Sequence, residues 1–207
     1  MSPKTRRIAL TGGIACGKSL VGEYLRQKGI LVIDADEVVH QLLREDATLK
    51  DKIRAEFGPD VFTDEGFVDR PRLGQQVFGD VTRRKLLESW IHPETRTVIE
   101  QFYKQNEQAH LAISIIPLLF ESNLEDRYDE VWLLQTDEAL QLARLEQQRG
   151  MTRQDAMARI RNQMSNEDKI RRAKQHPCHY TWENNSTPEQ LLTQLEQRLK
   201  ALSIQSP

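Results

Sequence analysis

The chain alternates between short apolar runs and longer stretches in which apolar residues recur at helical spacing. The short runs are rich in β-branched and aliphatic side chains, as buried strands are. Four of them lie at residues 8–10, 30–33, 111–116 and 131–134. A weaker run at 180–182 predicts a short last strand, and residues 188–202 have the leucine spacing of an amphipathic helix. Strands that alternate with helices predict an α/β fold with a parallel five-stranded sheet flanked by helices.

Two long helical stretches interrupt this alternation. Residues 37–110 show no strand pattern between the second and third runs, so we expect a large helical insertion there, which can cover a substrate. Residues 138–176 are helical and rich in arginine, with a break at Gly150, and we expect them to form a lid. The core in this division consists of residues 1–36, 111–137 and 177–207.

Composition adds mainly exclusions. A chain of 207 residues fits one core domain with room for insertions. The net charge of −2 gives no general attraction to nucleic acid or to a membrane, and no apolar run approaches the roughly 20 residues of a membrane span. Residues 1–7 are basic, but the apolar run after them is too short for a signal peptide, so we expect a cytoplasmic protein. Cys16 and Cys178 form neither a disulfide framework nor a metal-ligand spacing.

The segment from Gly12 to Ser19 carries the candidate chemistry. Its sequence, GGIACGKS, fits G-x-x-x-x-G-K-[ST] between a predicted strand and a predicted helix, which is the context of a phosphate-binding loop (P-loop). Glycines let backbone N–H groups surround an anion, and the start of the helix adds partial positive charge. Lys18 can reach the outer phosphates, and the Ser19 hydroxyl can bind Mg2+. The alternative, a glycine turn without function, is disfavoured by the Lys-Ser pair and by both flanks.

Two aspartates follow the second predicted strand. Ligands bind at the carboxyl ends of the strands in an open α/β sheet, so Asp34 should lie near the phosphate loop. A carboxylate there can orient an acceptor hydroxyl and take its proton. The alternative is that Asp34 and Asp36 only cap a helix whose first turn contains Glu37. Both can hold, with Asp36 as the cap and Asp34 at the site.

Seven arginines lie in the predicted lid. Most belong on solvated helix faces, but an arginine on a flap over the loop can close on the γ-phosphoryl group and stabilise the charge of the transition state. They are Arg144, Arg149, Arg153, Arg159, Arg161, Arg171 and Arg172.

Motifs along nearly the whole chain resemble the dephospho-coenzyme A kinase family. The P-loop is common to many kinases, whereas the Asp-Ala-Asp, His-Pro and Pro-Leu-Leu-Phe-Glu elements in this order are far more specific. The matching residues are Leu10 to Ile14, Ile33 to Asp36, Asp69-Arg70 with Leu73 and Phe78, Leu87-Glu88, His92-Pro93 with Arg96, Pro117 to Glu121, Gln141 with Arg144, Arg159-Ile160 with Gln163, and Glu183 to Asn185.

The resemblance implies transfer of the γ-phosphoryl group of ATP, with Mg2+, to the ribose 3′-hydroxyl of dephospho-coenzyme A. We expect a monomer or a weak homo-oligomer. Asp34 would be the general base, Lys18 the phosphate clamp and Ser19 the Mg2+ ligand. The implied nucleotide-binding residues are Gly13, Ile14, Ala15, Cys16, Gly17, Lys18, Ser19, Leu20, Arg144 and Arg159, with Arg144 also catalytic. The implied acceptor-binding residues are Asp34, Asp36, Arg70, His92, Arg96, Leu118 and Glu121. A His-Pro pair can also simply end a helix and pack, so His92 keeps that alternative.

Several positions depart from the family pattern. The family usually has Gly, Ser and Thr where this chain has Ala15, Cys16 and Leu20, so Leu20 lacks a hydroxyl that the family can offer to a phosphate. Gln148 replaces a second lid arginine, and Cys178-His179 replaces an Ala-Asp pair. A Cys16 thiol among backbone N–H groups and Lys18 suggests a second hypothesis, that alkylation of Cys16 blocks ATP binding and that ATP protects it. The alternative is that cysteine is only a tolerated small residue.

Two other functions fit the P-loop. Another small-molecule P-loop kinase, acting on a nucleoside or nucleoside monophosphate, would differ only in its acceptor. A nucleotide switch without an acceptor would need neither Asp34 nor a large helical insertion, and a guanine-binding switch should carry an Asn-Lys-x-Asp element, which the sequence lacks.

Overall fold

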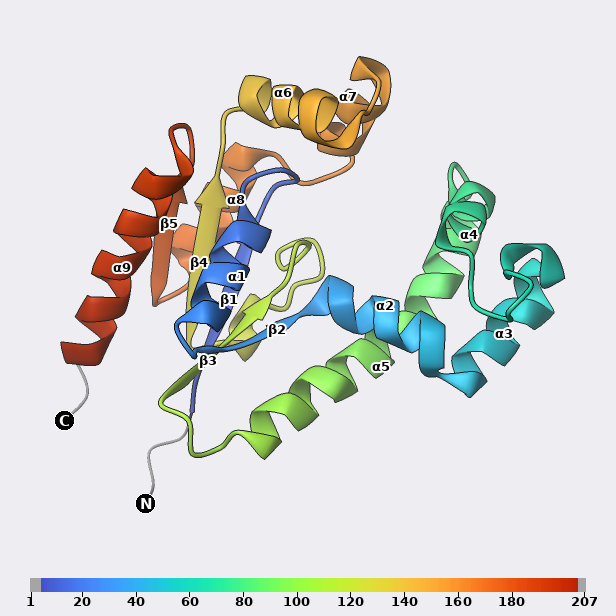
Figure 1. Cartoon of the computed structure of the whole chain (residues 1–207), viewed down its shortest axis with the longest axis horizontal. Helices are drawn as coiled ribbons and strands as arrows, with labels where there is room; N and C mark the ends of the chain where they lie inside the picture. Colours follow the sequence, from blue (N-terminus) through green and yellow to red (C-terminus); the bar gives the residue numbers. More distant parts are fainter. Residues whose placement is uncertain (1–4, 205–207) are drawn as a thin grey trace. The chain divides into compact units, whose positions relative to one another are not determined.

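The computed structural model describes residues 5–204 and divides the chain into two compact units (Figure 1). The first unit consists of residues 1–34 and 106–207, and the second of residues 35–105. Each is described by itself.

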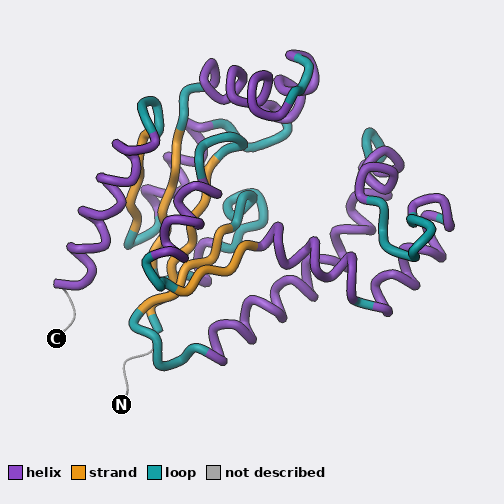
Figure 2. The backbone as a smooth tube through the Cα atoms, in the orientation of Figure 1, coloured by secondary structure: helices purple, strands orange, loops and turns teal. Residues whose placement is uncertain are grey.

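The first unit is built on one parallel sheet (Figure 2). The strands are in the order β2-β3-β1-β4-β5, and all four neighbouring pairs are parallel. This confirms the predicted five-stranded parallel sheet, including the weak last strand. The strands are β1 (Arg6–Gly12), β2 (Leu31–Asp34), β3 (Leu111–Ile115), β4 (Glu130–Gln135) and β5 (His179–Glu183).

Helices cover the sheet on both faces. Figure 1 draws α1 (Lys18–Gln27) and α9 (Pro188–Ile204) in front of the sheet and α8 (Asn166–Gln175) behind it. Helices α6 (Glu138–Arg149) and α7 (Arg153–Arg161) pack on each other, and a 3-10 turn, η2 (Glu125–Arg127), precedes β4.

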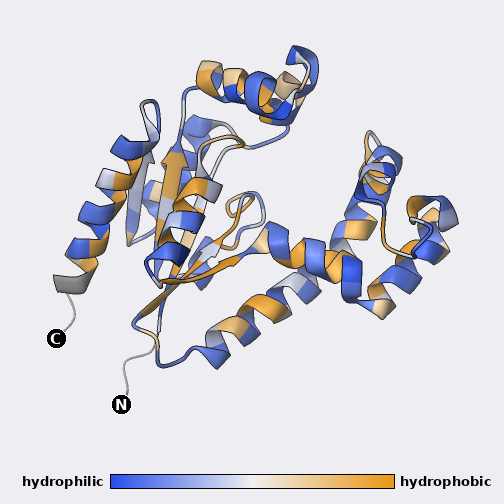
Figure 3. Cartoon of the chain, in the orientation of Figure 1, coloured by the Kyte–Doolittle hydropathy of each residue, from blue (hydrophilic) through white to orange (hydrophobic). Residues whose placement is uncertain are grey.

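The core of this unit follows the alternation of the strands. Every second residue of the central strands is buried against α1 and α9, and Figure 3 shows β4 as strongly hydrophobic, whereas α9 alternates between hydrophobic and hydrophilic residues. None of the helices in residues 5–204 combines the length and apolar composition that a membrane crossing needs. The strand residues of this core are Ile8, Leu10, Ile113, Ile115, Trp132, Leu134 and Trp182, and the helical ones are Val21, Leu25, Leu191, Leu195 and Leu202.

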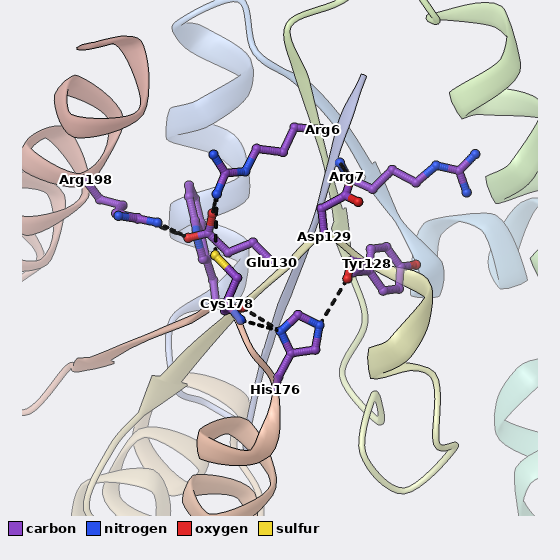
Figure 4. A network of polar contacts seen from close by, with 9 residues as sticks. Arg6, Arg7, Tyr128, Asp129, Glu130, His176, Cys178 and Arg198 are labelled. Atoms are coloured by element: carbon purple, nitrogen blue, oxygen red, sulfur yellow. Dashed lines mark hydrogen bonds and ion pairs between the residues drawn. The ribbon is translucent and has the colours of Figure 1, made fainter. Parts of the chain in front are cut away.

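A buried ion cluster closes the amino end of the sheet (Figure 4). Glu130, the first residue of β4, is fully buried. Its carboxylate contacts Arg6 on β1, at 2.8 Å, and Arg198 on α9, and it accepts a hydrogen bond from the indole Nε1 of Trp132 at 2.7 Å. The cluster therefore joins β1, β4 and α9 at the end of the sheet opposite to the P-loop.

A histidine beside this cluster ties the last strand to its neighbour (Figure 4). The buried imidazole of His176 lies 3.1 Å through Nε2 from the carbonyl oxygen of Tyr128 and 2.6 Å through Nδ1 from that of Cys178. It thus links the segment before β5 to the segment before β4. The Cys178 thiol lies 3.5 Å from a guanidinium nitrogen of Arg6.

The second unit is helical, with its own core. Its elements are α2 (Ala35–Glu45), α3 (Ala47–Phe57), the 3-10 turn η1 (Pro59–Val61), α4 (Arg70–Val77) and α5 (Val81–Gln105). Asp46 caps α3 by accepting from Leu49 N–H, and Asp69 caps α4 by accepting from Arg72 N–H. Apolar residues of α2, α3, α4 and α5 share one core: Leu43, Leu49, Ile53, Phe57, Leu73, Leu87 and Ile91.

Two local predictions for this unit are wrong. The His92-Pro93 pair does not end a helix, because α5 continues through it. Proline removes one backbone hydrogen bond there, but buried residues on both sides of it, such as Ile91 and Thr95, keep the helix packed. Asp36 is not the residue that precedes α2, because the helix begins one residue earlier, and its carboxylate lies within the positively polarised first turn.

Candidate active site

The loop between β1 and α1 adopts the conformation of an anion-binding turn. Gly12 and Gly17 have φ values of 150° and 97°, and α1 begins at Lys18. A Cβ atom on Gly12 would lie 2.3 Å from the carbonyl oxygen of Leu134, and one on Gly17 would lie 2.5 Å from the amide nitrogen of Asn184. Neighbouring segments therefore leave room only for glycine at both positions.

Side chains hold the carbonyl oxygens of five consecutive loop residues, 12–16. Lys18 lies within the P-loop motif, two other donors come from α6, and the fourth comes from the end of β5. The bonds run from Lys18 Nζ to Gly12 and Gly13 (2.9 and 2.8 Å), from Gln141 Nε2 to Ile14 (2.7 Å), from Arg144 Nη1 to Ala15 (3.1 Å) and from Asn184 Nδ2 to Cys16 (3.0 Å).

This arrangement determines what the loop can bind. In a trans peptide the N–H group points away from the carbonyl group. Because the carbonyls of Ile14 and Cys16 are turned to Gln141 and Asn184, the N–H groups of the following residues, Ala15 and Gly17, are directed to the opposite side. A row of such N–H groups beside a helix start binds anions such as phosphate.

Arg144, predicted from the resemblance, lies at the loop itself. Besides the Ala15 carbonyl, its guanidinium donates to the carbonyl of Asn184 at 2.9 Å and lies 3.3 Å from the Thr136 hydroxyl. It therefore joins the loop to the ends of β4 and β5. Arg159 on α7 is exposed, and within residues 5–204 its guanidinium group makes no hydrogen bond or ion pair.

The predicted base, Asp34, ends β2 at the carboxyl edge of the sheet. In the register, Asp34 is opposite Ile115 of β3, and Ile115 is opposite Leu10 of β1, two residues before Gly12. Two strand spacings of about 4.8 Å separate the Asp34 and Leu10 backbones by roughly 10 Å. Asp34 and the P-loop therefore end at the same edge of the sheet, with β3 between their strands.

The start of α1 suits a magnesium ion. Ser19 is exposed there, and Mg2+ takes hard oxygen ligands together with phosphate oxygens and water. In the described part of the chain, no three His, Cys, Asp or Glu side chains cluster in a way that would hold a metal without such phosphates. The side chain of Leu20 packs against the core, so only its backbone can face a nucleotide.

The segment after β3 contacts the chain's own helices. Glu121 accepts a hydrogen bond from Met164 N–H at 3.0 Å, and its carboxylate lies 3.4 Å from the Nζ of Lys169, whose side chain is buried. Glu121 thus holds the connection between α7 and α8. Leu118, three residues earlier, is largely exposed.

The remaining predicted acceptor residues belong to the second unit. Arg70 begins α4 and is exposed, and Asp36 is exposed on α2. His92 and Arg96 are exposed on α5 four residues apart, so they share one helical face.

The Cys16 thiol is fully buried, with Sγ 3.4 Å from Nε2 of Gln141. A reagent cannot reach it in this conformation, so burial favours the alternative that cysteine is a packed small residue. The effect of Cys16 alkylation on ATP binding stays a prediction.

Three polar residues around the loop received no role from the sequence. Gln141, Gln163 and Asn184 each contact the loop through a side-chain amide, and Gln163 Oε1 accepts from Ile14 N–H at 2.8 Å. All three belong to motifs that match the family, and this match was the only indication in the sequence that they have a role. No pattern of spacing could assign them, because they lie more than 120 residues from the loop in the chain.

The sheet order, the braced loop and the acidic residue at the end of β2 define the class of P-loop kinases. A family model described as dephospho-CoA kinase matches residues 6–186. The chain belongs to the dephospho-CoA kinase family. This membership decides against the nucleotide-switch alternative.

Individual relatives and solved structures are similar to the chain. A dephospho-CoA kinase of Shouchella clausii is 43% identical over 161 residues, which cover 76% of this chain and 81% of the relative. The crystal structure of TT1252 from Thermus thermophilus is 32% identical, with a TM-score of 0.81, and the match covers 99% of this chain and 100% of that one. The dephospho-CoA kinase structure from Campylobacter jejuni is 25% identical, with a TM-score of 0.66 over 96% and 97% of the two chains.

Proposed function

We propose that the chain transfers the γ-phosphoryl group of ATP to the ribose 3′-hydroxyl of dephospho-CoA, the last step of coenzyme A synthesis. Family membership supports the reaction. The register of the sheet supports the assignment of the reacting groups to Asp34 and the P-loop. Asp34 and the P-loop share the carboxyl edge of one sheet, with β3 between their strands. A phosphoryl donor in the loop and an acceptor beside Asp34 would then meet between them.

The roles follow from the chemistry of phosphoryl transfer. Asp34 orients the acceptor hydroxyl and accepts its proton. Lys18 neutralises the outer phosphates, and for this its ammonium group turns from the carbonyls of Gly12 and Gly13 toward the nucleotide. Arg144 keeps the loop in its binding conformation, and Arg159 approaches the γ-phosphoryl group from α7. When bound through Ser19, Mg2+ offsets phosphate charge.

The acceptor side is assigned to the second unit. His92 and Arg96, on one face of α5, and Arg70 on α4 supply positive or hydrogen-bonding groups for the phosphates of the acceptor. Asp36 completes this set in the second unit. Leu118 and Glu121 belong to the first unit, where Glu121 is engaged by Met164 and Lys169 and supports the connection between α7 and α8.

The test compares Asp34→Asn with Asp51→Asn, an exposed aspartate of α3. Labelled ATP and dephospho-CoA are supplied, with adenosine and AMP as competing acceptors. We expect Asp34→Asn to lower kcat about 100-fold or more, since this is the typical loss for a general base, while its affinity for ATP stays at the wild-type level. The control Asp51→Asn should keep the wild-type kcat.

Two results would contradict the proposal. Preferential labelling of a nucleoside would reassign the acceptor, and wild-type kcat in Asp34→Asn would remove the base. A cytoplasmic location and a monomeric or weakly associating chain remain predictions.

A further inference from the structure

The connection between α7 and α8 is attached to two parts of the site by neighbouring residues. Gln163 accepts a hydrogen bond from the Ile14 N–H of the P-loop, at 2.8 Å. The next residue, Met164, donates its N–H to Glu121 in the segment after β3, at 3.0 Å. The carboxyl end of α7 is therefore fixed to the nucleotide loop and to the strand-end segment at the same time.

The same loop peptide is held from its other side. The Ile14 carbonyl accepts from Gln141 of α6, and its N–H donates to Gln163, so two glutamines fix one residue of the loop. Apolar contacts support this arrangement, because Ile14 and Ala15 pack with the α6–α7 cluster that includes Leu145. The position of α7 is thus coupled to the conformation of the P-loop.

Arg159 lies in the last turn of α7, next to this contact. Gln163 follows it by four residues and lies two residues beyond Arg161, the last residue of α7. The chain stays in a tight turn there, because Gln163 N–H bonds to the carbonyl of Ile160 at 3.1 Å. The hydrogen bond of the Gln163 amide to the loop therefore fixes the end of the helix that carries Arg159.

We propose that Gln163 is a positioning residue, which holds Arg159 at the phosphoryl group by accepting a hydrogen bond from Ile14 N–H. The inference rests on the proposed function, in which Arg159 acts on the transferred group. The bond costs the loop one N–H donor, and in return it orients an arginine whose guanidinium group otherwise has no polar contact within the described residues. Arg159 is then preorganised before the transition state develops its charge.

The test is a double-mutant cycle on the 207-residue chain with ATP and dephospho-CoA. Gln163→Met removes the acceptor while keeping a similar side-chain length, and Arg159→Ala removes the guanidinium. Gln154→Met, at an exposed glutamine of α7, is the matched control. We expect Gln163→Met to lower kcat about 3- to 10-fold, the equivalent of one neutral hydrogen bond, with the KM for ATP changed less than about twofold.

Arg159→Ala alone should lower kcat about 100-fold or more, as loss of a preorganised electrostatic group does. Coupling between the two positions is the decisive readout, because a purely structural role would not produce it. With Arg159 already alanine, Gln163→Met should change kcat less than about twofold. Gln163→Asn, with a shorter amide, should lie between wild type and Gln163→Met, and it serves if the methionine variant folds poorly.

Each other outcome overturns the inference. Equal effects of Gln163→Met in both backgrounds would show that Gln163 acts independently of Arg159. A lower KM for ATP with unchanged kcat would show that the amide competes with phosphate for the Ile14 N–H. Wild-type kcat in Arg159→Ala would remove the arginine and with it the role of Gln163. These results differ from failure of the proposed function, in which the wild type itself does not phosphorylate dephospho-CoA.

Discussion

Replacement of Glu130 by glutamine tests how much the buried ion cluster stabilises the nucleotide-binding unit (Figure 4). The substitution keeps the shape of the side chain and an oxygen that can accept from Trp132. It removes the negative charge that faces two guanidinium groups, on Arg6 and Arg198. An amide cannot accept from both arginines and the indole, so at least one donor loses its partner.

The magnitude follows from burial. Breaking a fully buried ion pair costs about 3–5 kcal/mol, because a charge is left without a partner. The Glu130 side chain is 0% exposed, but those of Arg6 and Arg198 are 28% and 16% exposed and can recover some water. We therefore expect a loss of about 2–3 kcal/mol. For a chain of this size, 1 kcal/mol shifts Tm by about 2–4 °C, so Tm should fall by about 4–12 °C.

Thermal unfolding and kinase activity at 20 °C should separate stability from catalysis. Glu130 lies opposite Ile8 in the register, whereas Gly12 lies opposite Leu134, four strand residues and about 13 Å away. We therefore expect kcat of Glu130→Gln to stay within about twofold of wild type at that temperature. Glu88→Gln, in an exposed pair with Arg84, is the control and should change Tm by less than about 2 °C.

Two results would refute this reasoning. A Tm within about 2 °C of wild type would mean that both arginines find water or other partners when the carboxylate is absent. A large loss of kcat in a folded variant would mean that the amino end of the sheet is coupled to the P-loop.

Three smaller predictions concern the loop and the surface. Gly13→Ala should raise the KM for ATP about 3- to 10-fold, because its Cβ would lie 2.5 Å from Nε2 of Gln141; an unchanged KM would contradict the bracing role. Ala15→Gly should raise Tm by about 2 °C, because Ala15 has a φ of 60°, and removing this backbone strain slightly outweighs the greater entropy that glycine gives the unfolded chain. A lower Tm would contradict this. A hydrogen bond from Tyr24, and secondarily Lys28, lowers the pKa of the Glu196 carboxyl below its ordinary 4.5. The stability that this carboxylate contributes is present above pH 4.5 and is lost as the pH falls through the lowered pKa. The Tm of Glu196→Gln should therefore fall less steeply than that of the wild type on the acid side. An unchanged profile of Tm against pH would contradict this.

The strands and the P-loop were predictable because their determinants are local in sequence. The run at 30–33 was displaced by one residue from β2, which ends at Asp34 itself, so the proposed base is part of the strand. The weak run at 180–182 became β5 through its buried tryptophan, which packs on Trp132 of β4. Short continuous apolar runs therefore sufficed for the central strands, which are buried on both faces.

The side chains that shape the loop were not predictable from local patterns. Gln141 and Asn184 look like ordinary polar residues in sequence, and their roles come only from the fold, which brings α6 and the end of β5 to the loop. The course of α5 through Pro93 was missed for a related reason. The local rule counts the lost hydrogen bond, whereas tertiary packing on both sides of the proline outweighs it.

The side chains that hold the loop carbonyls determine what must move when a nucleotide binds. Three of the five braced carbonyls are held by residues outside the loop, Gln141, Arg144 and Asn184, and only Gly12 and Gly13 are held by Lys18. When Lys18 turns to a phosphate, the other three bonds remain. The N–H groups opposite them stay oriented, so binding requires one side chain to move rather than the loop to refold. The loop is therefore preorganised by α6 and by the end of β5 before a nucleotide binds.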